Sequence, residues 1–488
     1  MNKLRLIFVL GILSLMSCKE TTIIEYHEAG SNNNPDENGG GTKTIVEVPA
    51  GNITQSVKWT KDKVYRLNGF VRIGRDVKNS QGEPAVENVT LTIEPGTIII
   101  GDRESKGTLI VHRGNKIIAE GTEKEPIVFT SERQPGFREP GDWGGVVICG
   151  KAINNQNEAE LEGSYGAWHG GKDDEDNSGI LKYIRIEYAG IPINPNQEVN
   201  SLTMASLGRG TVVEYVQCSY GLDDAFEWFG GTVNCKYLVA YRGIDDDFDV
   251  DFGYRGNVQF AIAIRDANAA DQSGSNGFEV DNDGSGTNIQ PYTAPTFSNV
   301  SIIGPKKDFG KTISVQFQNA MHLRRNNKIK IHNSIFTGFP NGLFLQGDNT
   351  AANAAAGDLV IMKSIFAGVE SWGENGYGTG GSVNFPNPKG VPFIPINVGG
   401  KDVSEWIKTS SFGNETYMQW TALGLENSIF DLSDAPGLLP KSGSLLLSGA
   451  GFDKLPGFFE KVTYRGAFGT VNWTQGWANF APQQEVYL

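Results

Sequence analysis

Short apolar segments that recur at a fixed spacing constrain this chain more than any other feature of its sequence. Residues 91–93, 109–111 and 127–129 repeat every eighteen residues as Leu-Thr-Ile, Leu-Ile-Val and Ile-Val-Phe. Further on, residues 215–224 reappear as residues 237–246, at a spacing of twenty-two. A constant period is typical of a solenoid, in which each coil buries its inner face only by stacking on its neighbours. The sequence therefore predicts an all-β fold, a right-handed parallel β-helix.

Composition and charge agree with a turn-rich β protein and exclude some partners. The chain has 62 glycines, and only 20% of its residues are charged, which favours strands and turns over long helices. Its formal net charge of −14 argues against nucleic acid as a partner, because a binder of phosphates needs a basic face. The same charge argues against free polyanions unless a bound cation bridges them.

The first residues have the pattern of an export signal. Lys3 and Arg5 precede an apolar run at residues 6–16, and Cys18 follows directly after Ser17. A run this short does not span a bilayer core, which needs about twenty apolar residues. We expect residues 1–17 to be a lipoprotein signal peptide, Cys18 to carry the lipid, and polar residues 18–45 to form a flexible tether.

The rest of the chain divides into two parts. Residues 46–370 are predicted to form the β-helix, and residues 371–488 an irregular loop, further β-helix coils and a C-terminal cap. In the second part we expect a helix at residues 402–407 and strands at residues 425–432 and 445–447. The aromatic residues expected to cap the open end of the solenoid are Phe458, Phe459, Tyr464, Trp473 and Trp477.

The strand pattern resembles that of bacterial right-handed parallel β-helix lipoproteins. Residues 464–468 (Tyr-Arg-Gly-Ala-Phe) and 473–477 (Trp-Thr-Gln-Gly-Trp) are similar to the end of a largely uncharacterised cell-surface group of Bacteroidota and proteobacteria. The charged residues after Cys18 resemble the export signals of Bacteroidota surface lipoproteins. This resemblance implies a lipid anchor in the outer membrane, exposure at the cell surface, and association with a TonB-dependent transporter in uptake.

Carboxylates occupy alternate positions in two of the repeated strands. Residues two apart share a face of a strand, so Asp247, Asp249 and Asp251 are expected to point outward, and the alternation recurs at residues 279–283. Matching the coils by their inward residues predicts two outward columns. One contains Thr203, Glu227, Asp249, Glu279, His322 and Phe344, and the other contains Ala205, Phe229, Asp251, Asp281, Arg324 and Gln346.

Stacked carboxylates need compensation, because two of them about 4.8 Å apart repel by roughly 3–4 kcal/mol at an effective dielectric near 20. A bound cation, protonation, or pairing with arginine would each supply it. Oxygen ligands on a rigid sheet suit calcium better than magnesium. The arginines available are Arg242, Arg255, Arg265, Arg324 and Arg325. The expected calcium ligands are Glu227, Asp247, Asp249, Asp251, Glu279, Asp281 and Asp283.

Other polar residues are candidates for binding a ligand. Acidic residues 173–176 follow Trp168, whose indole has the chemistry to stack on a sugar ring. The repeated turns supply four more carboxylates, at Asp223, Asp224, Asp245 and Asp246. Past the lipidation site the cysteines are Cys149, Cys218 and Cys235; the last two either pair or stay as buried thiols.

We favour a non-enzymatic surface lipoprotein, a binding or accessory module for nutrient uptake with a calcium-binding acidic face and a polysaccharide as its candidate ligand. The alternative is an enzyme: a calcium-dependent polysaccharide lyase with Arg324 as base and Glu279 among its ligands, or a glycoside hydrolase. The hydrolase would use the pair Asp249 and Glu279, or Asp223 and Asp245. Acids that repeat coil after coil favour the binding module, and a third hypothesis, a spacer, predicts no saturable ligand.

Overall fold

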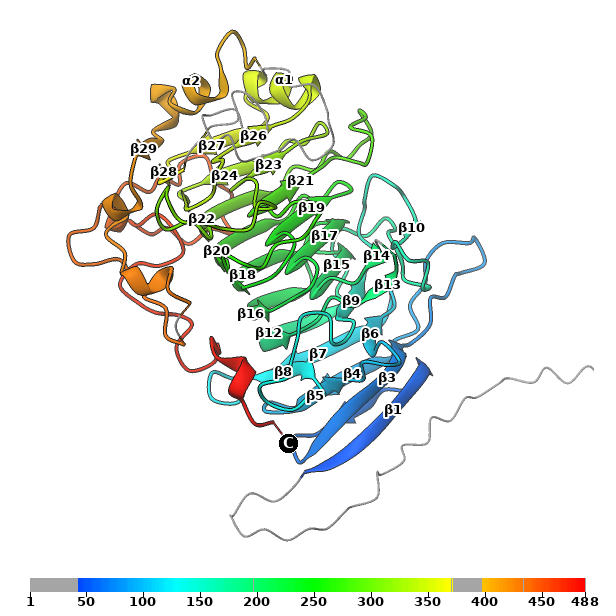
Figure 1. Ribbon diagram of the computed structural model, residues 1–488. Helices are drawn as coiled ribbons and strands as arrows, with labels where there is room; N and C mark the ends of the chain where they lie inside the picture. Colours follow the sequence, from blue (N-terminus) through cyan, green and yellow to red (C-terminus); the bar gives the residue numbers. More distant parts are fainter. Residues whose placement is uncertain (1–42, 196, 370, 372–396, 433, 488) are drawn as a thin grey trace, which may run out of the picture.

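The protein is a parallel β-helix, as predicted. The computed structural model describes residues 43–195, 197–369, 371, 397–432 and 434–487. Its main sheet contains 25 strands, and every pairing within it is parallel. Figure 1 shows the coils stacked from β1 at one end to β26 and β27 near the other.

Three ladders of strands form the faces of the coils, and five long strands belong to two of them. The first ladder contains β2 (Val57–Trp59), β4 (Thr90–Ile93), β7 (Lys116–Glu120), β24 (Lys330–His332) and β27 (Val360–Met362). The second contains β5 (Ile98–Gly101), β8 (Ile127–Ser131), β25 (Ile335–Thr337), β28 (Ile365–Ala367) and β29 (Glu415–Tyr417). The strands shared by both are β12 (Gly179–Glu187), β16 (Val212–Ser219), β18 (Asn234–Tyr241), β20 (Asn257–Ile264) and β22 (Thr296–Ile303).

The third ladder carries the acidic columns. It contains β6 (Thr108–Val111), β9 (Val146–Cys149), β15 (Leu202–Leu207), β17 (Phe226–Gly231), β19 (Phe248–Asp251), β21 (Phe278–Val280), β23 (His322–Leu323) and β26 (Phe344–Leu345). The N-terminal strands β1 (Thr44–Ile53) and β3 (Lys63–Ile73) contribute to the second and third ladders.

The spacing of twenty-two residues is the length of a coil, whereas the spacing of eighteen is not. Val216 pairs with Leu238 across neighbouring coils, as predicted. Leu91, however, pairs with Ile117 and not with Leu109, because β4, β6 and β8 lie in three different ladders. The eighteen-residue period therefore connects every second strand of the chain, because β5 lies between β4 and β6, and β7 between β6 and β8.

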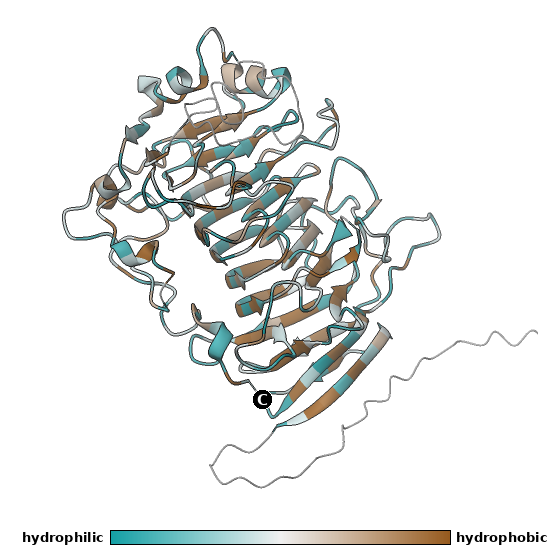
Figure 2. Ribbon diagram, viewed as in Figure 1, coloured by the Kyte–Doolittle hydropathy of each residue, from teal (hydrophilic) through white to brown (hydrophobic). Residues whose placement is uncertain are grey.

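The interior of the coils is apolar and rich in aromatic rings. Phe226, Phe248 and Phe278 are fully buried in successive coils, with ring centroids 5.8 and 5.2 Å apart. Figure 2 shows hydrophobic residues concentrated in the strands and hydrophilic residues mostly in the connecting loops. At the C-terminal end α1 (Asp348–Ala356) and α2 (Val403–Ile407) add buried residues to the same core, and α2 confirms the predicted helix.

Two predictions for the C-terminal part are wrong. The segments expected to be strands at residues 425–432 and 445–447 contain the 3-10 helices η3 (Asn427–Ile429) and η4 (Leu445–Leu447). The aromatic tail does not cap the open end but returns along the side of the coils, so that the chain ends near β1 (Figure 1). Trp477, for example, packs edge-on against Tyr183 and Tyr215. Short apolar runs do not distinguish a strand from a buried turn of helix.

Two small antiparallel hairpins project beside the third ladder. They pair β10 (Ala159–Glu160) with β11 (Trp168–His169), and β13 (Pro192–Asn194) with β14 (Gln197–Glu198). Their apolar residues Leu161, Tyr165 and Val199 pack on the outer side of the coils in a separate cluster. Among the described residues, no helix is long and apolar enough to cross a membrane.

Candidate functional site

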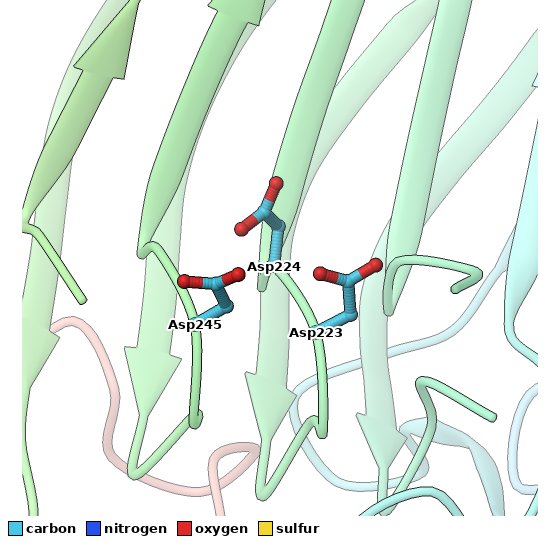
Figure 3. A group of neighbouring side chains, drawn as sticks. All are labelled: Asp223, Asp224 and Asp245. Atoms are coloured by element: carbon cyan, nitrogen blue, oxygen red, sulfur yellow. The ribbon is translucent and has the colours of Figure 1, made fainter. Parts of the chain in front are cut away.

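The turns that lead into the third ladder bring five carboxylates together. Asp223 and Asp224 lie between β16 and β17, and Asp245 and Asp246 occupy the equivalent turn of the next coil. Figure 3 shows Asp223 and Asp224 on one turn and Asp245 on the next. Asp249 follows in β19, and we call these five residues the acidic cluster.

The carboxylates of the acidic cluster form two overlapping groups. One oxygen each from Asp223, Asp224 and Asp245 lies within 4.8 Å of the others, and the same holds for Asp224, Asp246 and Asp249. Asp224 belongs to both groups. Asp223, Asp245 and Asp249 are partly exposed, whereas Asp224 and Asp246 are 7% and 3% exposed. The cluster thus has buried oxygens at its base and accessible ones around them.

Burial and mutual repulsion raise the pKa values of this cluster. The pKa of Asp223 rises to about 7, first because its carboxyl is largely withdrawn from water, and then because Glu198 and Glu162 of the side hairpins repel its charge. Burial, followed by neighbouring acids, also raises the pKa of Asp224, Asp245 and Asp249 well above the usual value. Negative charge here is costly unless a proton or a cation balances it.

Among the described residues, no lysine or arginine forms an ion pair with the acidic cluster; Arg265 and Arg324 act on Asp246 only through their field. The hydrogen bonds of the cluster come from neutral groups: the Asp246 amide donates to Asp224 at 2.9 Å, the Asn276 amide to Asp246 at 2.5 Å, and the Ser273 hydroxyl to Asp245 at 3.2 Å. These bonds fix the carboxylates in place without pairing them with a positive charge.

The next carboxylates along the column are compensated by arginine. The predicted register is confirmed: Glu227 lies beside Asp249, Asp249 beside Glu279, and Glu279 beside His322. The Arg324 guanidinium donates to Glu279 and, at 2.8 Å, to Asp281, and Arg325 also pairs with Asp281. Burial raises the pKa of Glu279, but the charge of Arg324, the hydrogen bond and charge of His322 and the charge of Arg325 together outweigh it and lower that pKa to about 2.

Two of the predicted calcium ligands serve the scaffold. The prediction that Asp247 points outward is wrong: it precedes β19, and its fully buried carboxylate pairs with the buried Arg265 at 2.8 Å. Asp283 accepts hydrogen bonds from the backbone amides of Ser285 and Thr287, and so shapes its own loop. Neither belongs to the acidic cluster.

The other predicted residues lie outside the acidic cluster. Arg242 pairs with Asp266, and Arg255 pairs with Asp174. Glu227 accepts a hydrogen bond from the side-chain amide of Asn200. Asp251 lies two residues beyond Asp249 in β19, and its pKa is raised to about 8 by burial and by Asp281. Cys149, Cys218 and Cys235 are free buried thiols, which settles the alternative for the last two. Cys18 lies outside the described residues.

Residues 51–387 match the family described as Pectate-lyase like beta helix domain, a match that covers more than half of the chain. The chain belongs to this family. A comparison with the curated proteins found no match, and a comparison with the solved structures found none either.

The donors of this pectate-lyase-like β-helix fit a hard cation. All are carboxylate oxygens, three of them within 4.8 Å of one another in each group, and the turns that carry four of the acids lead directly into the paired strands β17 and β19. Calcium accepts six to eight oxygens at about 2.3–2.6 Å in a tolerant geometry, and it leaves positions for water or a ligand. The fit rests on one observation: among the described residues, no arginine or lysine forms an ion pair with these acids.

Trp168 and the acidic stretch after it form a different surface of the pectate-lyase-like protein. The Trp168 side chain is 38% exposed. Asp174 pairs with Arg255 and Glu175 with Arg209, so the charges of this stretch are met by basic partners. Sequence reasoning missed Glu162 and Glu198 near the acidic cluster, because the hairpins that carry them lie outside the repeat and have no register to match.

Proposed function

We propose that this protein binds calcium in the acidic cluster and, through the calcium, an acidic polysaccharide. The observation that carries the proposal is the pair of overlapping carboxylate groups with which no described lysine or arginine forms an ion pair, beside coils where arginines do pair with the acids. Asp224, shared by both groups, would be the central ligand, with Asp223, Asp245, Asp246 and Asp249 around it. The bound cation would supply positive charge to an otherwise negative surface.

The class of ligand follows from charge and family. A protein with a net charge of −14 repels a free polyanion, whereas calcium with unfilled coordination positions attracts carboxylates. The pectate-lyase-like β-helix supports a carbohydrate ligand. Uronate-containing polysaccharides combine both properties and are the class we propose.

A binding role is favoured over lyase chemistry. The lyase hypothesis needs Arg324 to abstract a proton, yet the carboxylates of Glu279 and Asp281 raise the pKa of this guanidinium, and an arginine so paired stays protonated. The hydrolase alternative retains one supporting observation: Asp223, with a pKa near 7, lies beside Asp245, a pattern that suits a general acid.

The proposal includes the cellular location of the protein. A lipid on Cys18 would anchor the chain in the outer membrane, with the β-helix at the cell surface, and the tether would let it present a captured polysaccharide to a TonB-dependent transporter. The support is the pattern of residues 1–18 in the sequence.

Binding of polygalacturonate, measured with calcium and with a chelator, tests this function. We expect calcium-dependent binding without the ultraviolet absorbance of unsaturated products, and no binding of neutral dextran. Asp224→Asn should abolish binding, and Glu175→Gln, an equal charge change at an exposed ion pair, should preserve it. Cleavage of the polymer would favour the enzyme hypotheses, and absence of any binding would contradict the proposal.

A further inference from the structure

The C-terminal segment, residues 449–487, contacts coils that are far apart in the solenoid. Gly451 lies against Asn333 of the coil that contains β24 and β25, and Tyr487 lies against Glu187 at the end of β12. Figure 1 shows this segment descending outside the ladders to the end of the molecule where β1 lies. We call it the C-terminal strap.

Three amide side chains of the coils hold the backbone of the strap by the same two-bond pattern. Gln217 donates to the carbonyl of Asn479 at 2.7 Å and accepts from its amide at 2.8 Å. Gln259 makes the equivalent pair of bonds with Glu460, at 2.9 and 2.8 Å. Asn333 repeats the pattern with Gly451, at 3.1 and 2.8 Å. All three amides are fully buried.

Aromatic residues at the bends of the long strands provide a second attachment. Tyr183, Tyr215 and Tyr237 have φ between 52° and 60°, a conformation that bulky residues rarely adopt, and their rings stack at 4.5 and 4.3 Å. Trp477 of the strap packs edge-on against Tyr183 and Tyr215, and Trp473 lies 5.4 Å from Tyr237. The strained column is thus covered by the strap.

The end of the strap is fastened by polar contacts. The Tyr487 hydroxyl donates to the buried carboxylate of Glu187 at 2.8 Å, and the Arg138 guanidinium lies 4.9 Å from the centre of the Tyr487 ring. Arg138 also donates to the carbonyl of Pro482 at 2.7 Å, and Gln483 donates back to the Arg138 carbonyl at 2.8 Å.

We propose that the strap is a clasp that locks the stacked coils into one unit. In a solenoid each coil contacts only its neighbours, so coils at an end open independently of the rest. The strap connects β12 with the coil that contains β24 and β25, and so links coils that are far apart in the stack. Its attachment sites come from separate coils, so they exist only once those coils have stacked, and the clasp closes last.

The clasp is independent of the calcium proposal, because its contacts lie on the first two ladders and the acidic cluster leads into the third. Hydrogen exchange of the full chain tests it. In the double variant Gln217→Leu/Gln259→Leu we expect exchange to rise at least about tenfold in the strap and also in β8, β12 and β16. The matched control Gln81→Leu changes an exposed loop residue and should leave exchange unaltered.

Tyr487→Phe removes a single hydroxyl and serves as the milder variant if the double variant does not fold. It should raise exchange in the last residues of the strap and in β12, where Glu187 loses its partner. Faster exchange in the strap alone, with β8 and β12 unchanged, would overturn the clasp and leave the strap as a passive cover. Unchanged exchange everywhere would equally overturn it.

Discussion

At the scale of residues, the partner of each carboxylate decides whether it stabilises the scaffold or is free to bind a cation. Glu279 and Asp281 lie within reach of Arg324, and Asp247 is paired with Arg265. The five acids of the acidic cluster raise one another's pKa values, and none of the described basic residues forms an ion pair with them. Within a few coils, some carboxylates of a column are therefore paired with arginines, whereas others are left to bind a proton or a cation.

This arrangement predicts an unusual pH dependence of stability in the absence of calcium. The pKa values of Asp223 and Asp251, about 7 and about 8, lie far above the usual value near 3.9. Between the usual value and the raised one, each of these carboxyl groups is protonated in the folded chain and ionised in the unfolded chain. Stability is then highest at the acidic side of this window and falls as pH rises through it, by at most about 1.4 kcal/mol per pH unit for each group.

Urea unfolding from pH 5 to pH 8 with a chelator measures this dependence. The free energy of unfolding should fall toward pH 8, and calcium should restore more stability at pH 8 than at pH 5 because it replaces the protons. Asp223→Asn should flatten the slope and the exposed Glu175→Gln should not. The buried His112, His169 and His332, whose pKa values burial lowers to about 4, 3 and 4, add a slope of opposite sign below about pH 6.5, so the test is the difference between variants. Equal slopes for the parent and Asp223→Asn would show that Asp223 is not held protonated.

The sequence located most of these residues but not their grouping. Matching the coils by their inward residues aligned Glu227, Asp249 and Glu279 correctly and placed Arg324 directly after Asp281 in the second column. It did not reveal that Asp247 turns inward, because that residue lies in a turn where alternation of faces does not apply. The sequence could not show that the turn residues lie close to Asp249, because this proximity is visible only in the three-dimensional structure.

At the scale of elements, the third ladder is stiffened by the aromatic stack beneath the acidic cluster. Phe248 lies in β19 between Phe226 and Phe278, fully buried, on the strand that carries Asp249. Phe248→Ala should lower the free energy of unfolding by about 3–5 kcal/mol, through lost burial and the cavity left behind. Denaturant unfolding would measure it, with Phe137→Ala, 68% exposed, as a control expected within about 0.5 kcal/mol of the parent. An equal, small effect of both substitutions would contradict a packed interior.

Elements outside the repeat were the least predictable. Regular coils impose a period on the sequence, and that period identified the ladders. The 3-10 helices η3 and η4 are single turns whose Ile429 and Leu446 belong to one apolar cluster with Ile262 and Ile335 of the coils. Such contacts leave no local pattern to read.

At the scale of the whole molecule, the acidic cluster and the C-terminal strap lie on different faces of one solenoid. The acidic cluster lies at the entry to the third ladder, and the C-terminal strap binds across the first and second. The sequence predicted the solenoid but assigned the aromatic tail to its open end, because nothing in residues 449–487 indicates which coils they meet. The partners, Gln217, Gln259 and Glu187, are hundreds of residues away along the chain.

Calorimetric titration of calcium into the chelator-treated protein tests the central claim most directly. We predict saturable binding with a Kd of about 10⁻⁴–10⁻³ M or tighter, the range of extracellular calcium modules. Asp224→Asn keeps an oxygen to accept the Asp246 amide but removes the charge shared by both groups, and should weaken binding at least about tenfold. Glu175→Gln should bind as the parent does. No saturable heat, or equal binding by Asp224→Asn, would contradict a calcium site in the acidic cluster.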